Sequence, residues 1–167
     1  MRYVPLVPFA LSWILVAYLP VHAEIIYVNL EAAGTDSGMS CEDAHCELQT
    51  AIQRAHNGDE IWVAEATYLP TPSGERTISF SLREGIALYG GFAATEQSRD
   101  QRNPARHPSI LSGNIGDPDS SLDNSYRIIE SFDLPLPPRV DGFTVREAYN
   151  EREGVDGRGG GVYNVRT

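Results

Sequence analysis

Short apolar segments separated by turn-forming residues dominate the chain after residue 23. A first segment, EIIYVN, spans residues 24–29. Seven more begin at Glu60, Arg76, Ile86, Ser109, Tyr126, Val140 and Gly160. They are rich in β-branched and aromatic residues, and Gly, Pro, Asn, Asp and Ser lie between them. This pattern predicts a set of short strands joined by irregular turns.

One segment has helical rather than strand periodicity. In CELQTAIQRAHNG, the residues Leu48, Ala51, Ile52 and Ala55 recur at i, i+3, i+4 and i+7 and form one apolar stripe. The dipeptide Asn57-Gly58 is a helix stop signal. We therefore expect one short helix within residues 47–56 that covers a neighbouring apolar surface.

The many predicted strands and the single predicted helix exclude some fold classes. A doubly wound parallel sheet needs helices on both faces, and no second amphipathic helix follows. An antiparallel sandwich or barrel and a solenoid of short strands both remain open. The uneven spacing of 10 to 23 residues between segments, and Gly directly after strands in LYGGF and LSGN, favour the solenoid, with the helix as an end cap. The predicted core comprises Ile26, Val28, Leu48, Ile52, Ile61, Val63, Phe80, Leu82, Ile86, Leu88, Ile110, Leu111, Ile128, Val140, Phe143 and Val145.

Residues 1–23 have the layout of a secretory signal peptide. Arg2 precedes a mostly apolar run from Val4 to Leu19, and VHA ends at Ala23 with small residues at the cleavage position. The alternative is a membrane anchor, but the run is short for a spanning helix and is interrupted by prolines. We expect export and no membrane span after signal removal, hence a secreted or cell-surface protein.

The charge excludes some partners. The chain has 13 basic residues, all of them Arg, and 23 acidic ones, for a net charge of −10. Removal of residues 1–23 takes away only Arg2, which leaves −11. A surface with this negative charge repels nucleic acid and anionic membranes. We therefore expect neither of them as a partner.

The two cysteines, Cys41 and Cys46, flank His45 in SCEDAHCELQ. A metal site with His45 is one interpretation, but four zinc ligands are not in view. A disulfide that closes a small loop is the favoured one, because an exported chain meets an oxidising compartment.

These segments together resemble a known family. IYVNLEAAGTDSG, NGDEIWVAEATYLPT, RTISFSLREGIALYGGFAATEQSRDQRNP, SILSGNIGD, VDGFTV and GGGVYN resemble, in this order, the N-terminal part of bacterial right-handed parallel β-helix surface proteins. CEDAHCELQTAI is similar in part to a CSLREA-type module with a cysteine pair, although Glu47 and Gln49-Thr50 depart from its pattern. That similarity supports pairing Cys41 with Cys46.

The resemblance implies an all-β, pectate-lyase-like solenoid. A strand and capping helix would occupy residues 24–58 and the first coils residues 59–167. In this family, further coils follow a Gly-rich stretch like the one at 157–161, so a truncated chain or fragment is expected. Its open C-terminal coil would be prone to self-association.

Three loops carry candidate chemistry. DPDSSLD places Asp117, Asp119 and Asp123 close together, where a loose calcium site is the alternative to a solvated loop. SRDQRNPARHP groups Arg99, Arg102, Arg106 and His107, where a patch for acidic sugars is the alternative to pairing with Asp100, Glu96 or another loop. REAYNEREGVDGRG carries Glu147, Glu151, Glu153 and Asp156, and a run of this kind is typical of a solvated loop.

No catalytic, cofactor or metal residue can be assigned from these patterns. GRGGG is followed by a strand-like run and the chain has no Lys, which argues against a phosphate loop. The aromatic residues Trp62, Tyr68, Tyr89, Phe92 and Tyr163 could stack on sugars, but their place within strands favours core packing. The sequence favours a non-catalytic, adhesin-like surface protein. The alternative is a protein that binds or degrades extracellular polysaccharide.

Overall fold

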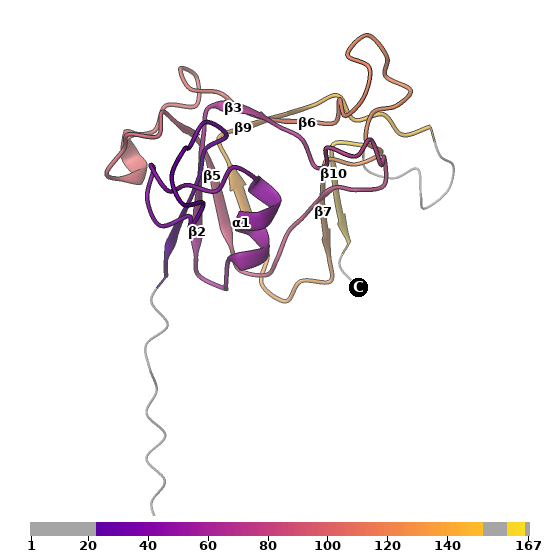
Figure 1. The fold of residues 1–167 in the computed structure, drawn as a ribbon. Coiled ribbons are helices and arrows are strands. Elements are labelled where there is room, and N and C mark those ends of the chain that lie inside the picture. The colour runs from indigo at the N-terminus through magenta and orange to yellow at the C-terminus, as the bar shows by residue number, and fades with distance from the viewer. Residues whose placement is uncertain (1–22, 152–159, 166–167) are drawn as a thin grey trace, which may run out of the picture.

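The computed structural model describes residues 23–151 and 160–165 (Figure 1). Within this part of the chain, ten short strands accompany one α-helix and one 3-10 turn. The strands are β1 (Ile25–Val28), β2 (Glu60–Ala64), β3 (Ala66–Tyr68), β4 (Phe80–Ser81), β5 (Ala87–Phe92), β6 (Ser109–Ser112), β7 (Ile129–Phe132), β8 (Arg139–Asp141), β9 (Phe143–Arg146) and β10 (Val162–Val165). The helix α1 spans Leu48–Arg54, and the turn η1 spans Arg99–Gln101. The predicted signal peptide lies outside the described residues, except for Ala23.

The strands form three small parallel sheets. Their orders are β1-β2-β5-β8, β10-β7-β4 and β3-β6-β9. Every paired strand comes from a different part of the chain, so no sheet contains a tight hairpin. The predicted strand segments are therefore confirmed, and two of them, at residues 60–68 and 140–145, are each divided into two strands.

The prediction of a right-handed parallel β-helix, a pectate-lyase-like solenoid, is wrong for this structure. The strands are only two to six residues long and belong to three separate sheets of three or four strands. Loops of very different length join these strands, and no solenoid is formed among the described residues. The fold is a cluster of three small parallel sheets with little helix.

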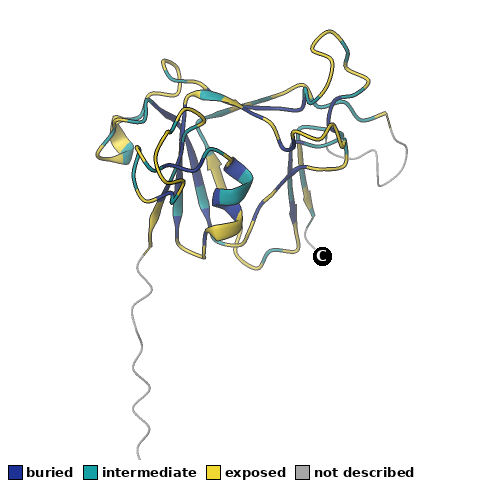
Figure 2. Ribbon diagram, viewed as in Figure 1, coloured by how far each residue is buried: buried dark blue, intermediate teal, exposed yellow. Residues whose placement is uncertain are grey.

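The main core lies where the three sheets face one another, and Figure 2 shows buried residues concentrated along the strands. Most of the predicted core residues are buried there. The exceptions are Ile110, Val140, Phe143 and Val145. Ile110 points outward because its neighbour Leu111 points inward, and the other three lie on the edge strands β8 and β9.

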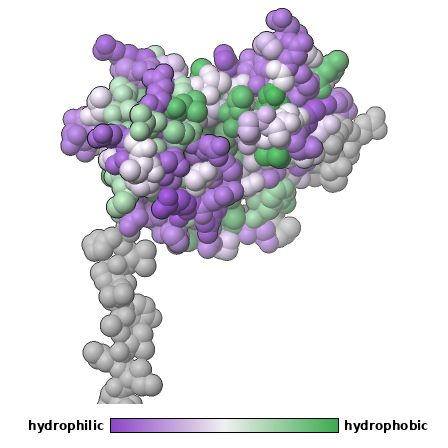
Figure 3. Space-filling view, viewed as in Figure 1, coloured by the Kyte–Doolittle hydropathy of each residue, from purple (hydrophilic) through white to green (hydrophobic). Residues whose placement is uncertain are grey.

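The predicted helix is confirmed, with ends at Leu48 and Arg54. Its buried residues Leu48, Ala51 and Ile52 are those of the predicted apolar stripe, and the helix packs against β1, β2 and β4. No helix among the described residues is long and apolar enough to cross a membrane. On the side shown in Figure 3, hydrophilic residues cover most of the surface and hydrophobic ones form scattered small groups.

Candidate functional site

The outer face of the four-stranded sheet carries a second, smaller core of aromatic residues. Trp62 and Phe92 stack with ring centroids 4.7 Å apart, and Tyr27 meets Trp62 edge-on at 5.7 Å. Tyr89 is buried in the same cluster. The aromatic residues thus pack against one another, as the sequence predicted. Of the five that could stack on sugars, Trp62, Tyr68, Tyr89 and Phe92 are buried and Tyr163 is half-buried.

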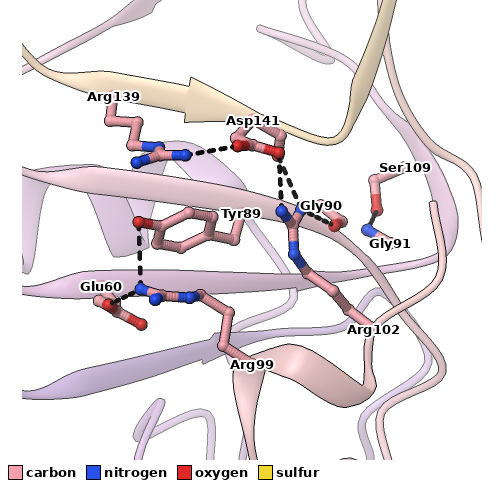
Figure 4. A network of polar contacts seen from close by, with 9 residues as sticks. All are labelled: Glu60, Tyr89, Gly90, Gly91, Arg99, Arg102, Ser109, Arg139 and Asp141. Carbon is pink, nitrogen blue, oxygen red and sulfur yellow. Dashed lines mark hydrogen bonds and ion pairs between the residues drawn. The ribbon is translucent and has the colours of Figure 1, made fainter.

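Three arginines surround Tyr89 at the edge of this cluster. The guanidinium carbons of Arg99, Arg102 and Arg139 lie 4.7, 5.2 and 5.5 Å from the centre of the Tyr89 ring. Arg99 and Arg102 come from η1 and the residue after it, whereas Arg139 comes from β8. Figure 4 shows the three side chains converging on the ring from the loop and from the neighbouring strand. We call Arg99, Arg102, Arg139 and Tyr89 the arginine cluster.

Two carboxylates on the sheet hold the arginines in place. Glu60 accepts a hydrogen bond of 2.5 Å from Nη1 of Arg99. Asp141 accepts from Nη2 of Arg102 at 2.7 Å and from Nη2 of Arg139 at 2.8 Å (Figure 4). Because the register aligns Glu60 with Ala87 and Ala87 with Arg139, and Tyr89 with Asp141, these groups meet across three adjacent strands.

Glycines allow the arginine loop, residues 93–108, to lie close to the sheet. A Cβ on Gly91 would lie 2.5 to 2.7 Å from Pro104, and one on Gly142 would lie 2.4 Å from Nη1 of Arg102. The backbone N–H of Gly91 donates to Oγ of Ser109, and its carbonyl accepts from Asn103. The loop is thereby fixed at both its backbone and its side chains.

The charges of the arginine cluster are coupled through these contacts. Hydrogen bonds from Arg139 and then Arg102 lower the pKa of Asp141 below its ordinary value. The hydrogen bond to Asp141 is also the main cause that raises the pKa of Arg139. Three guanidinium groups against two carboxylates leave a local charge of +1 in a chain that is strongly acidic overall.

The exposed part of the arginine cluster has free donors. The side chains of Arg99 and Arg139 are 42% and 63% exposed, whereas that of Arg102 is 18% exposed. Within the described part of the chain, Nη2 and Nε of Arg99 and Nη1 and Nε of Arg139 have no hydrogen-bond partner. The Tyr89 hydroxyl accepts from Arg99 at 3.2 Å, so its proton remains available to a ligand. An oxyanion at the exposed side of either guanidinium group would meet charge-assisted donors.

We expect acid to weaken this part of the fold through Asp141. Because its folded pKa is lower than the unfolded value of about 3.9, its contribution is fully present above about pH 4 and is lost as the pH falls through the folded pKa. Asp141→Asn should therefore lower the free energy of unfolding by about 1 kcal/mol at pH 7, since the ion pairs are partly exposed. Urea unfolding at pH 7 and pH 2.5 would measure this. The difference between wild type and variant should shrink at pH 2.5, and a difference that does not change with pH would contradict the assignment.

The other candidate residues of the loop are paired or solvated. The sequence favoured pairing of these residues with Asp100, Glu96 or another loop. Arg99 and Arg102 are paired, but with Glu60 and Asp141 on strands and not with a loop. His107 lies 3.0 Å from Glu65 of the segment between β2 and β3. Arg106 is exposed.

Cys41 and Cys46 are both free in the structure, so the predicted disulfide is not formed there. Cys41 lies beside Tyr27, Trp62 and Phe92, whereas the thiol of Cys46 lies 3.6 Å from the Ala32 carbonyl oxygen and lines a different hollow. The two side chains thus belong to different surroundings.

His45 between the cysteines is almost fully buried. Its Nδ1 is 3.4 Å from Asp36, and its Nε2 is 3.3 Å from Nη1 of Arg54. A guanidinium group beside Nε2 opposes metal binding at that nitrogen.

The acidic loops are engaged in local contacts. Asp117 N–H donates to Asp123 at 2.7 Å, and Asp119 N–H donates to Asp117 at 3.0 Å, so these carboxylates close their own loop. No group of three or more His, Cys, Asp and Glu residues in the described ranges is arranged to hold a metal ion.

Of the acidic residues near the last strand, the two that the structure describes, Glu147 and Glu151, are engaged in side-chain contacts. Glu151 forms a two-pronged ion pair with Arg76, and Glu147 accepts from the Ser112 hydroxyl. Glu153 and Asp156 lie outside the described residues.

Comparisons with protein-family models, curated proteins and solved structures found no match for this chain. The likeness to β-helix surface proteins therefore stays a resemblance of sequence segments. The arginine cluster has to be interpreted from its own geometry.

Proposed function

We propose that the protein is an exported, non-catalytic surface protein that binds acidic polysaccharide through the arginine cluster. The observation that carries this proposal is the pair of exposed guanidinium groups, Arg99 and Arg139, with free donors on either side of the Tyr89 hydroxyl. The signal-like sequence at residues 1–23 supports placement outside the cell, where such polymers occur.

The chemistry of the cluster favours a carboxylate as the ligand group. Guanidinium donors match the two oxygens of a carboxylate, and the Tyr89 hydroxyl can add a third hydrogen bond. The ring of Tyr89 is buried, so the sugar itself would not stack on it. Recognition would depend on the charge of the ligand and would weaken with added salt.

The same geometry favours binding over catalysis. Both oxygens of Glu60 are occupied, one by Arg99 and the other by the indole N–H of Trp62 at 2.8 Å. Asp141 is held between Arg102 and Arg139. Both carboxylates are therefore engaged by neighbouring donors, and neither is free to act as a proton donor or nucleophile.

The test is binding to polygalacturonate, measured by isothermal titration calorimetry at low and high salt. Wild-type protein should bind this polymer and not neutral dextran. Arg99→Gln and Arg139→Gln should each weaken binding roughly tenfold, because each removes charge-assisted hydrogen bonds. The double variant should show no measurable binding.

Arg83→Gln is the matched control, because Arg83 is an exposed arginine after β4 that donates to the carbonyl of Gln53 in α1. It makes the same charge change without touching the cluster and should leave binding unchanged. Equal loss in all three single variants would mean that only net charge matters. Equal binding of wild type and the double variant would overturn the proposal.

A further inference from the structure

Glu60 holds Arg99 with only one of its two carboxylate oxygens. Its Oε1 accepts from Nη1 of Arg99 at 2.5 Å, whereas its Oε2 accepts from the indole N–H of Trp62 at 2.8 Å. Nη1 of Arg99 also donates to the Tyr89 hydroxyl at 3.2 Å. Within the described residues, the hydrogen bonds of the Arg99 side chain therefore all start from this one nitrogen.

The other two nitrogens of Arg99, Nε and Nη2, form one edge of the planar guanidinium group. Two parallel N–H donors on such an edge match the two oxygens of a carboxylate and form a two-pronged pair with it. The Arg99 side chain is 42% exposed. This edge is thus the part of Arg99 that can bind a ligand carboxylate most strongly.

Glu60 and Arg99 have the groups for a stronger ion pair than the one they form. A carboxylate beside a guanidinium group frequently engages two of its nitrogens, one with each oxygen. If Glu60 turned both oxygens to Arg99, it would take Nη2 as well as Nη1 and break up the free edge. The only other hydrogen bond of the Glu60 side chain among the described residues is the one from Trp62. The indole N–H therefore keeps the second oxygen away from Arg99.

Aromatic packing fixes the direction of the indole N–H. Trp62 is 4% exposed, its ring stacks on Phe92 with an angle of 12° between the planes, and Tyr27 meets it edge-on. Trp62 and Glu60 are two residues apart on β2, so their side chains lie on the same face of the sheet. An oriented donor is thereby held beside the carboxylate that holds Arg99.

We propose that Trp62 is a positioning residue of the ligand site. By donating to Glu60, it limits Glu60 to one contact with Arg99 and keeps the edge of Nε and Nη2 open for a ligand carboxylate. Trp62 is buried, so it acts through Glu60 and does not touch the ligand. Its role in binding rests on the proposed function, whereas its effect on Arg99 can be measured without a ligand.

The ligand-free test is the rate at which phenylglyoxal modifies Arg99, measured by mass spectrometry of the digested protein. This reagent condenses with the terminal guanidinium nitrogens and reacts more slowly where they are engaged in an ion pair. Trp62→Phe keeps an aromatic ring beside Phe92 but removes the donor, so modification of Arg99 should slow severalfold. Arg106, which is exposed in the same loop, is the internal standard and should react alike in every variant.

Adding Glu60→Gln to Trp62→Phe separates this role from a loss of packing. A glutamine side chain has a single acceptor oxygen, so it cannot engage two nitrogens of Arg99. The double variant should therefore recover the wild-type rate. Tyr27→Leu is the matched control, because it removes an aromatic contact of Trp62 and leaves the indole donor; it should not change the rate. A rate at Arg99 that Trp62→Phe does not slow, or that Glu60→Gln does not restore, would overturn the proposal.

Calorimetric titration with polygalacturonate tests the consequence for binding. Trp62→Phe should weaken binding roughly tenfold, because the two-pronged contact with Arg99 is lost, and the double variant should bind more tightly than Trp62→Phe. An unchanged affinity of Trp62→Phe would also overturn the positioning role. A wild type that does not bind this polymer would overturn the proposed function, and the modification rates would still decide whether Trp62 controls the contact between Glu60 and Arg99.

Discussion

Replacing Gly91 with alanine should lower the free energy of unfolding by about 3 kcal/mol or more and abolish binding at the arginine cluster. Gly91 has φ of +98°, a conformation that an L-residue adopts at a cost of roughly 1–2 kcal/mol. The added Cβ would lie 2.7 Å from both N and Cα of Pro104. Backbone atoms cannot rotate away, so the loop that carries Arg99 and Arg102 would have to move off the sheet.

Gly58→Ala separates conformational strain from the steric clash. Gly58 has the same φ of +98°, but a Cβ there would have no atom within 4 Å. We expect a loss of about 1–2 kcal/mol from strain alone and unchanged ligand binding. Urea unfolding and calorimetric titration of the two variants would measure both effects. Equal destabilisation by the two substitutions would show that Pro104 does not restrict this site.

Local structure was readable from the sequence because it depends on near neighbours. The stripe of Leu48, Ala51 and Ile52 needs only the 3.6-residue period, and it predicted the helix correctly. Strand segments were found in the same way from their β-branched and aromatic content. Their division into three small sheets was not found, because strand length and pairing depend on contacts between distant parts of the chain.

The alternation of side chains along a strand limits how well core residues can be predicted from the sequence. Ile110 and Leu111 are equally apolar, and only the register of β6 with β3 and β9 decides which of them faces inward. Val140 and Val145 are apolar residues on strands as well. Their exposure follows from their position at the edges of sheets, which a hydrophobicity pattern does not contain.

Only part of the candidate site could be predicted from the sequence, because its other residues are brought in by strand pairing. The sequence indicated the cluster of Arg99 and Arg102 and the chemistry of guanidinium groups. Their partners Glu60 and Asp141 each lie 39 residues away and meet them through strand register. Outward-facing charges on predicted strands were the available signal, but without the pairing no partner could be chosen among the acidic residues.

Replacing Phe80 with alanine should produce the largest loss of stability among simple core truncations, about 3–5 kcal/mol. Phe80 is 1% exposed and lies on β4, the strand that packs against α1 and pairs with β7. Its removal would leave a cavity where helix and sheets meet. Because β4 has only two residues, few other contacts hold this strand in place.

Phe132→Ala provides the comparison, since Phe132 ends the neighbouring strand β7 and is 50% exposed. We expect about 1 kcal/mol from this variant, because half of the side chain is already in water and it contacts Tyr163 at 5.6 Å between ring centroids. Urea unfolding followed by circular dichroism would measure both losses. If Phe80→Ala cost no more than Phe132→Ala, the contact between α1 and β4 would not be part of the stabilising core. The contact between the sheets would then depend more on other fully buried residues, such as Ile61 and Leu111.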